Sequence, residues 1–140
     1  MLYKLSTYVS RKLCKGAYLL EVSGIVVEED VFNPSSDLTQ SIINGVTRGL
    51  RACRYNVKHE DTICICVQNS KVYNWLNHAE ENPDYMDDLE ELYNTLNSLD
   101  CMYKFVLDKN SYAKTFLESS EGLNKSKVKG SGVAEAFEGM

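Results

Sequence analysis

Apolar and polar residues alternate along the first part of the chain in the way that a half-buried sheet requires. The segments LYKLSTYVS (2–10) and GAYLLEVSG (16–24) are rich in Tyr, Leu, Val and Thr, and IVVEEDVF (25–32) follows a turn at Gly24. Period-2 alternation of β-branched and aromatic residues is typical of strands. The pattern therefore predicts an antiparallel meander of three strands.

The next segment changes to helical spacing. Pro34 ends the third strand, and Ser35 or Ser36 can cap a helix that runs to about Arg54. Apolar residues recur every three or four positions between these limits, which is the pattern of a helix with one face in the core.

The rest of the chain alternates between strand and helix patterns. The segment TICICVQ (62–68) is nearly all apolar, which is typical of a strand covered on both faces. The elements expected after it are a helix following Ser70, a helix over 84–99, a strand over 101–107 and a helix over 111–122. This order predicts an α/β fold in which a mixed five-stranded sheet carries helices on both faces.

A single domain accommodates these elements. It covers residues 1–122, and a flexible tail rich in Lys, Ser and Gly is expected over 123–140. The expected core residues are Leu5, Leu19, Ile25, Ile42, Leu50, Ile63, Ile65, Trp75, Leu92, Leu96, Phe105 and Phe116.

Composition limits the class of protein. With 44% hydrophobic and 25% charged residues, the chain is typical of a soluble globular protein. No apolar run approaches the roughly 18 residues of a membrane span, and the N-terminal stretch lacks the apolar core of a signal peptide. The five cysteines, an odd number, then indicate reduced thiols, and Cys64 and Cys66 are expected to pack in the core. We expect a cytoplasmic protein, bacterial or viral from its small size, with no membrane partner and no cofactor.

The net charge of −5 conceals an uneven distribution. Eight acids and no Lys or Arg lie between Ala79 and Tyr103, whereas the remainder has twelve acids and fifteen bases. The mildly basic remainder is compatible with a nucleic-acid partner.

Three short motifs occur in an informative order: GAY (16–18), VQNSKVYNWL (67–76) and KNSYAKTFLE (109–118). They resemble, in turn, the start of the second strand, the strand-turn-helix and the last helix of the ribonuclease H-like superfamily. The resemblance implies a sheet with strand order 3-2-1-4-5. It also implies a site at which family members cleave phosphodiesters with two divalent cations held by four acids.

The acids of the family are missing from the matching positions. Carried over, these positions fall at Tyr8 or Thr7, near Thr39 or Gln40, at Asn69 and at Lys114. Hard cations need clustered carboxylates, and Asp37 is the one acid nearby. The resemblance therefore implies a catalytically degenerate member that has no metal site and is not an enzyme.

Without those acids, the former active-site face is expected to bind nucleic acid. A lysine can contact a phosphate where the enzyme holds a metal, and tyrosines can stack on unpaired bases. The residues expected to bind are Lys4, Tyr8, Arg11, Lys12, Lys15, Arg48, Arg51, Arg54, Lys58, Asn69, Lys71 and Lys114. RNA or a single strand is the favoured ligand because the family handles RNA-containing strands. A phage-encoded protein that binds messenger RNA is one hypothesis compatible with this ligand.

Two alternatives stay open. A protein-interaction module could use the acidic helix 84–100 and the C-terminal tail. A divalent-metal nuclease could use a rearranged acidic site built from Glu21, Glu28, Asp30 and Asp37.

Overall fold

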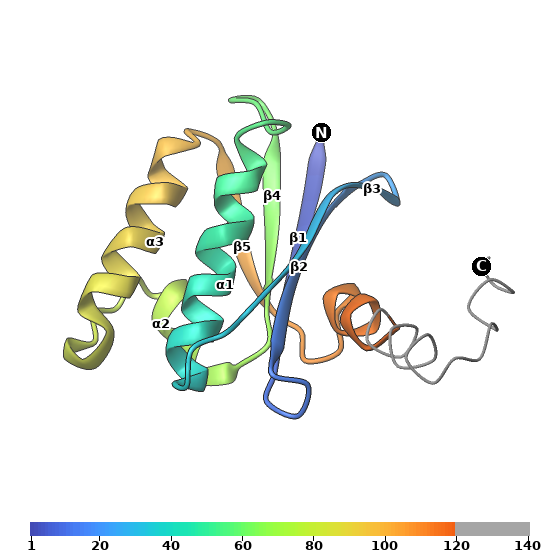
Figure 1. The fold of residues 1–140 in the computed structure, drawn as a ribbon. Coiled ribbons are helices and arrows are strands. Elements are labelled where there is room, and N and C mark those ends of the chain that lie inside the picture. The colour runs from blue at the N-terminus through green and yellow to red at the C-terminus, as the bar shows by residue number, and fades with distance from the viewer. Residues whose placement is uncertain (120–140) are drawn as a thin grey trace, which may run out of the picture.

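The computed structural model of the chain describes residues 1–119, which form one mixed sheet with helices on its two faces (Figure 1). The strands are β1 (Leu2–Ser10), β2 (Lys15–Val22), β3 (Ile25–Phe32), β4 (Thr62–Val67) and β5 (Met102–Leu107). Their order is β3-β2-β1-β4-β5, with antiparallel pairing from β3 to β1 and parallel pairing from β1 to β5. This topology confirms the predicted mixed sheet, including the place of TICICV beside β1.

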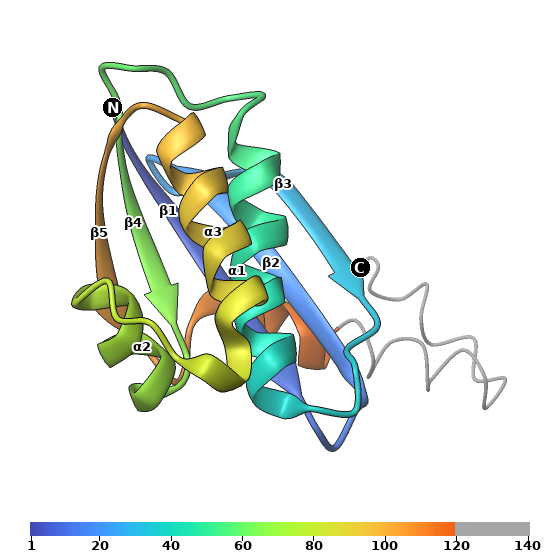
Figure 2. The ribbon, with the colours of Figure 1, turned by 90° about the vertical axis from the view of Figure 1, so that its left-hand side faces the viewer.

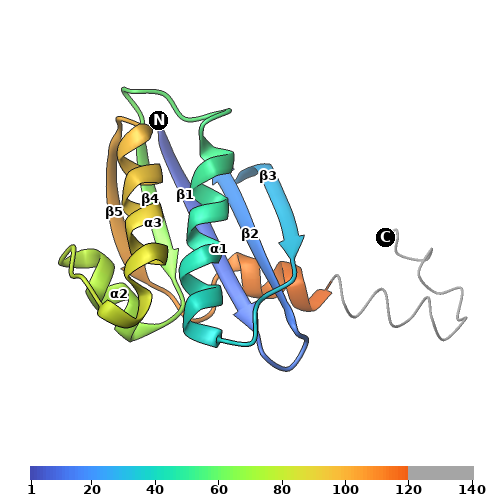
Figure 3. The same ribbon diagram turned by 60° about the vertical axis from the view of Figure 1, so that its left-hand side comes forward.

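The helices divide unequally between the faces. The elements α1 (Leu38–Cys53), α2 (Ser70–Asn77) and α3 (Met86–Ser98) lie on one face, which we call the helical face, and a short 3₁₀ helix (Pro83–Tyr85) precedes α3. In Figures 2 and 3, α1 and α3 lie side by side across the strands, with β5 and β3 at the two edges of the sheet. The opposite face, called the far face, carries a helix that begins at residue 112 and continues to the end of the described chain, which we call the C-terminal helix.

The main core lies between the sheet and α1. Leu5, Ile42, Leu50, Ile63 and Ile65 are at most 2% exposed, as their spacing predicts. The other predicted core residues are buried or partly buried, with one exception.

Ile25 is the exception, because its side chain is 65% exposed. Ile25 is the first residue of the edge strand β3, and a register shift at Leu20/Glu21 pairs it with Val22 at the end of the hairpin. Alternation along a strand predicts a face, but it does not reveal how far along the strand that face is covered.

The cap of α1 also differs from the prediction. Asp37, rather than Ser35 or Ser36, accepts the Gln40 N–H at 3.1 Å through its carboxylate. Ser35 instead accepts a hydrogen bond from the Asp37 N–H in the loop before the helix. The helix therefore begins after Asp37, a residue type as suitable for capping as serine.

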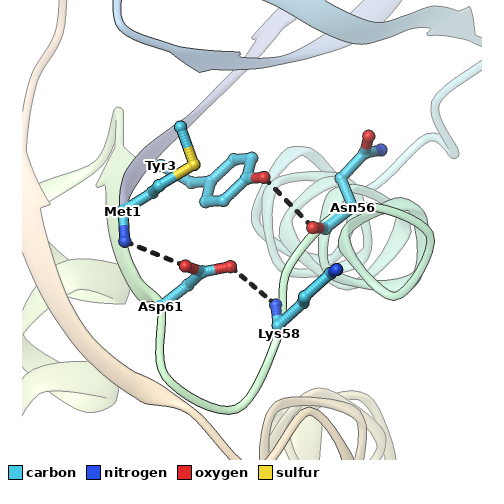
Figure 4. Close-up of polar contacts among 5 residues, drawn as sticks. All are labelled: Met1, Tyr3, Asn56, Lys58 and Asp61. Atoms are coloured by element: carbon cyan, nitrogen blue, oxygen red, sulfur yellow. Dashed lines mark hydrogen bonds and ion pairs between the residues drawn. The ribbon is translucent and has the colours of Figure 1, made fainter.

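The N-terminus is tied to the sheet edge where β1 begins. The Met1 ammonium lies 2.9 Å from Asp61 Oδ1, and Asp61 Oδ2 accepts the Lys58 N–H at 2.8 Å (Figure 4). These two donors hold the pKa of Asp61 below its usual value. The Tyr3 hydroxyl donates to the Asn56 carbonyl at 3.1 Å beside them.

All five cysteines lie within the described residues and are free thiols, with Cys66 buried and Cys64 partly buried. None of the described helices combines the length and apolar character needed to cross a bilayer. The expected tail over 123–140 and the end of the predicted last helix lie outside the described residues.

Candidate nucleic-acid interface

Strands β1, β4 and β5 finish at the same end of the sheet, which lies at the bottom of Figure 1. We call this end the strand-end edge, as distinct from the lateral edges formed by β3 and β5. Four connections meet there: the β1–β2 hairpin, the β3–α1 loop, the β4–α2 turn and the segment between β5 and the C-terminal helix. In open α/β sheets, ligands bind outside the carboxyl ends of the parallel strands. This edge is therefore the first place to look for a site.

The strand-end edge is strongly basic. Its connections and adjoining first turns carry the bases Arg11, Lys12, Lys15, Lys71, Lys109 and Lys114 and the acids Asp37 and Asp108. Both acids are engaged locally, because Asp37 accepts from Gln40 and Tyr85 and Asp108 accepts the Asn110 N–H at 3.0 Å. The helices α1 and α2 also begin here, so their positive dipole ends add to the attraction for an anion. The acidic first turn of α3, with Asp87 and Asp88, lies beside the start of α1, where Asp88 accepts from the Gln40 amide at 3.3 Å.

Lys114 is held over an aromatic ring at this edge. Its ammonium lies 5.8 Å from the centre of the Tyr8 ring and donates to Asn110 Oδ1 at 3.1 Å. A lysine has three donors, so this geometry positions the charge and leaves donors for a phosphate. The structure thus brings together two predicted residues that are more than 100 positions apart in the chain.

A second lysine-tyrosine pair lies on the same face. The Lys4 ammonium is 5.4 Å from the centre of the Tyr112 ring, which belongs to the C-terminal helix and is 59% exposed. The sequence prediction missed Tyr112 and Lys109. Their position just after β5, as Asn69 follows β4, is the signal that could have identified them.

The turn after β4 has a structural role. The Asn69 side chain caps α2 by accepting the N–H groups of Lys71 and Val72, at 2.9 Å and 3.1 Å. The Gln68 amide spans to β1, where it accepts from the Val9 N–H at 2.6 Å and donates to the Val9 carbonyl at 3.1 Å. These bonds fix the ends of β1 and β4 against each other, which makes the edge rigid.

The arginines of α1 lie elsewhere, on the outer side of the helical face. Arg51 forms an ion pair with Glu91 of α3, and the Arg48 guanidinium lies 5.1 Å from the centre of the Phe32 ring. Arg54 lies 5.0 Å from the centre of the Tyr55 ring.

Acids accompany these arginines. A hollow of about 240 Å³ beside them is also lined by Glu28 and Asp30. Burial raises the pKa of Tyr18 in this hollow, and the two carboxylates raise it further. This mixed surface offers a phosphate less net attraction than the strand-end edge does.

The twelve predicted residues therefore fall into separate groups. The strand-end edge holds Tyr8, Arg11, Lys12, Lys15, Asn69, Lys71 and Lys114. Lys4 lies on the same face as Tyr8 but nearer the start of β1, away from the strand-end edge. Arg48 and Arg51 lie on α1, Arg54 is its C-cap residue, and Lys58 lies beside Asp61 at the opposite edge.

The structure does not bring the four acids of the rearranged nuclease together. Glu28 and Asp30 line one hollow, whereas Glu21 faces Lys4 across the β1–β2 ladder and Asp37 caps α1. Within residues 1–119, no three His, Cys, Asp or Glu side chains are grouped closely enough to hold a metal ion.

Comparison with known proteins gives a likeness at the level of structure. No protein-family model and no curated protein sequence matches the chain. An RNase H1 from the halophilic archaeon Halobacterium salinarum matches with a TM-score of 0.61 and 12% identity, over 81% of this chain and 88% of that chain. LC11-RNase H1, solved with an RNA/DNA hybrid, matches with a TM-score of 0.61 and 9% identity, over 81% and 91%. The N-terminal RNase H domain of a Mycobacterium tuberculosis protein matches with a TM-score of 0.61 and 11% identity, over 81% and 87%.

These neighbours correct one prediction. The sequence predicted that the chain is not an enzyme, because the four family positions lack acids. That prediction is contradicted, since the solved structures that share the fold are RNase H enzymes. The shared topology and coverage show that the chain has the ribonuclease H-like α/β fold, with a mixed five-stranded sheet in the order 3-2-1-4-5.

Proposed function

We propose that the chain binds nucleic acid across the strand-end edge, with RNA or a single strand as the preferred ligand. The observation that carries the proposal is that the four connections at that edge, with the first turns that adjoin them, hold six bases and two locally bonded acids. Each phosphate contact by Lys or Arg releases counterions, which supplies affinity that does not depend on sequence. The hybrid bound by LC11-RNase H1 supports the choice of ligand class.

Aromatic side chains support a preference for unpaired bases. Tyr8 and Tyr112 lie next to Lys114 and Lys4, so a strand that follows the lysines passes close to two rings. Stacking of a base on an aromatic ring contributes roughly 1–3 kcal/mol and tolerates any base. A duplex hides those base faces, and it should therefore gain less from these tyrosines.

Fluorescence anisotropy with four labelled ligands tests the proposal. Single-stranded RNA, single-stranded DNA, duplex DNA and an RNA–DNA hybrid of equal length are titrated at two salt concentrations. We expect single strands to bind best, and affinity to fall as salt rises. Incubation of the same hybrid with Mg²⁺ measures cleavage in parallel.

A pair of charge-matched variants locates the interface. Arg11→Glu with Lys12→Glu reverses two exposed charges in the β1–β2 hairpin, whereas Arg54→Glu with Lys58→Glu reverses two exposed charges away from the strand-end edge. Both variants change the net charge equally. The hairpin variant should lose most of the binding, and equal losses in both variants would contradict the proposed location.

A protein-interaction function is the second candidate, and one observation favours it. A hollow of about 280 Å³ on α3 is lined by Met86, Leu89, Tyr93, Glu81 and Glu90, and Met86 is 55% exposed. A basic partner with an apolar anchor matches this surface. Loss of nucleic-acid binding at physiological salt, together with a partner sensitive to Glu90→Gln, would favour this candidate.

A further inference from the structure

The described elements cover only half of the far face. The C-terminal helix crosses the half next to the strand-end edge (Figure 1). Four residues that share this face by strand register, Ser6, Ala17, Leu19 and Cys66, are at most 4% exposed. Because alternate residues of a strand point to the same face, the strand registers identify which residues occupy the other half.

That other half, which we call the open face, consists of two cross-strand rows. The first row crosses β1, β4 and β5 and contains, in this order, Leu2, Thr62 and Met102. The second row crosses all five strands from β3 to β5 and contains, in this order, Val26, Glu21, Lys4, Cys64 and Lys104. Leu2, Val26 and Met102 are 58%, 44% and 73% exposed. The open face is thus apolar at three positions, with Lys4 and Lys104 among them.

Glu21 marks a missing contact on this face. Its side chain is 8% exposed, and within the described chain its Oε2 atom has no hydrogen-bond partner. A buried carboxylate oxygen without a donor is costly, since it has lost water and gained nothing in return. The arrangement therefore calls for an occupant that brings a donor to Glu21 and apolar groups to Leu2, Val26 and Met102.

We propose that the occupant is the segment 120–140 of this chain, which lies outside the described residues. The described part of the C-terminal helix ends at residue 119 on the far face, so the segment is attached to the chain on that face. Its 21 residues can span up to about 70 Å when extended, whereas five strands are only about 24 Å across. The attachment point and the length of the segment therefore allow it to reach every part of the open face.

The sequence of this segment complements the open face in charge and in apolar content. Lys125, Lys127 and Lys129 supply donors for Glu21. Val133 and Phe137 supply apolar groups for Leu2 and Met102, and Glu135 or Glu138 can pair with Lys104. This one segment thus contains both the hydrogen-bond donors and the apolar side chains that the open face requires.

Methionine oxidation in the full-length chain tests the proposal with an internal control. In the described structure Met102 is 73% exposed and Met86, on α3, is 55% exposed, so an uncovered Met102 should oxidise at least as fast as Met86. Dilute hydrogen peroxide and peptide mass spectrometry give both rates in one sample. A covered Met102 oxidises more slowly than Met86.

Two variants test whether the slower oxidation of Met102 is caused by the segment 120–140. Phe137→Ser removes the apolar anchor and Glu21→Gln removes the charge partner, and each should raise the Met102 rate above the Met86 rate. Asp30→Asn, in the hollow beside Arg48 and away from both methionines, is the matched control and should leave the ratio unchanged. Oxidation of Met102 as fast as Met86 in the unaltered chain, or protection that survives Phe137→Ser, overturns the proposal.

A concentration series excludes the main competing occupant. Protection by the segment of the same chain does not depend on protein concentration. Protection that grows with concentration, together with a dimer in analytical ultracentrifugation, would assign the open face to a second copy and overturn the proposal.

Discussion

Replacing Gly49 by alanine tests the contact between α1 and β1, which sets the thickness of the core. A Cβ atom built at Gly49 would lie 2.7 Å from Leu5 Cδ1 and 3.0 Å from Leu5 Cδ2. Both atoms belong to a side chain that is fully buried, so it has little room to yield. Gly49 is therefore the residue that lets α1 approach the sheet closely.

Two opposing effects decide the sign of the change. Alanine is favoured over glycine inside a helix by about 0.8–1.0 kcal/mol. Adding a methyl group to a packed core costs typically 1–3 kcal/mol. The second effect is larger, so Gly49→Ala should lower the free energy of unfolding by about 1 kcal/mol.

Urea denaturation followed by circular dichroism measures this change, and a second substitution tests its cause. Leu5→Val removes the atoms nearest to the added methyl group and should cost roughly 1 kcal/mol by itself. In the Leu5→Val background Gly49→Ala should become less destabilising or neutral, because the two nearest atoms are gone and only a γ carbon, in the place of the Leu5 Cγ at 3.2 Å, stays close. Asn44→Ala, on the partly exposed side of α1, is the control and should stabilise by roughly 0.5 kcal/mol. If Gly49→Ala stabilises the unaltered protein, the close packing of α1 on β1 is wrong.

Three further predictions concern packing, titration and thiol chemistry. Leu92→Ala should lower the free energy of unfolding by about 2–5 kcal/mol, because the Leu92 side chain is fully buried; a loss below 1 kcal/mol in the same urea assay would contradict that burial. Asp61→Asn should destabilise the protein at neutral pH. Because the folded pKa of Asp61 is lowered, its contribution is present above the unfolded pKa of roughly 4 and is lost as the pH falls through the folded pKa. The two urea midpoints should therefore draw together as the pH falls below about 4, and a gap that does not shrink would count against the Met1 contact. Burial raises the pKa of Cys53 to about 12, so iodoacetamide at pH 8 should label exposed Cys14 first and Cys53 only after unfolding; equal labelling rates by mass spectrometry would refute this.

Local patterns were sufficient to predict most of the fold. Alternation in β1, the apolar run in β4 and the helical spacing of α1 each depend on nearby residues, and each was confirmed. The topology followed from the family resemblance, which the shared fold now supports. The error at Ile25 arose because burial at the end of an edge strand depends on distant elements.

The site was harder to predict because the acids that face a group of bases come from distant parts of the chain. Spacing places Arg48 and Arg51 near each other on one helix, but Glu91 of α3 and Asp30 of β3 come from other parts of the chain. A sequence does not show which acids will face such arginines. Lys114 and Tyr8 were predicted together only because the resemblance assigned both to one pocket.

Binding of single-stranded RNA by Lys114 variants tests the central claim most directly. The structure holds the Lys114 ammonium over Tyr8 at the strand-end edge, whereas Lys58 lies at the opposite edge. Lys114→Glu should weaken binding more than Lys114→Ala, since it adds repulsion to the loss of attraction. The slope of log K against log salt should become shallower by about 0.7 for one lost contact to a single strand. Lys58→Glu, with the same change in charge, should retain the parent affinity and slope. Equal binding by the Lys114→Glu variant and the parent protein would contradict the proposed interface.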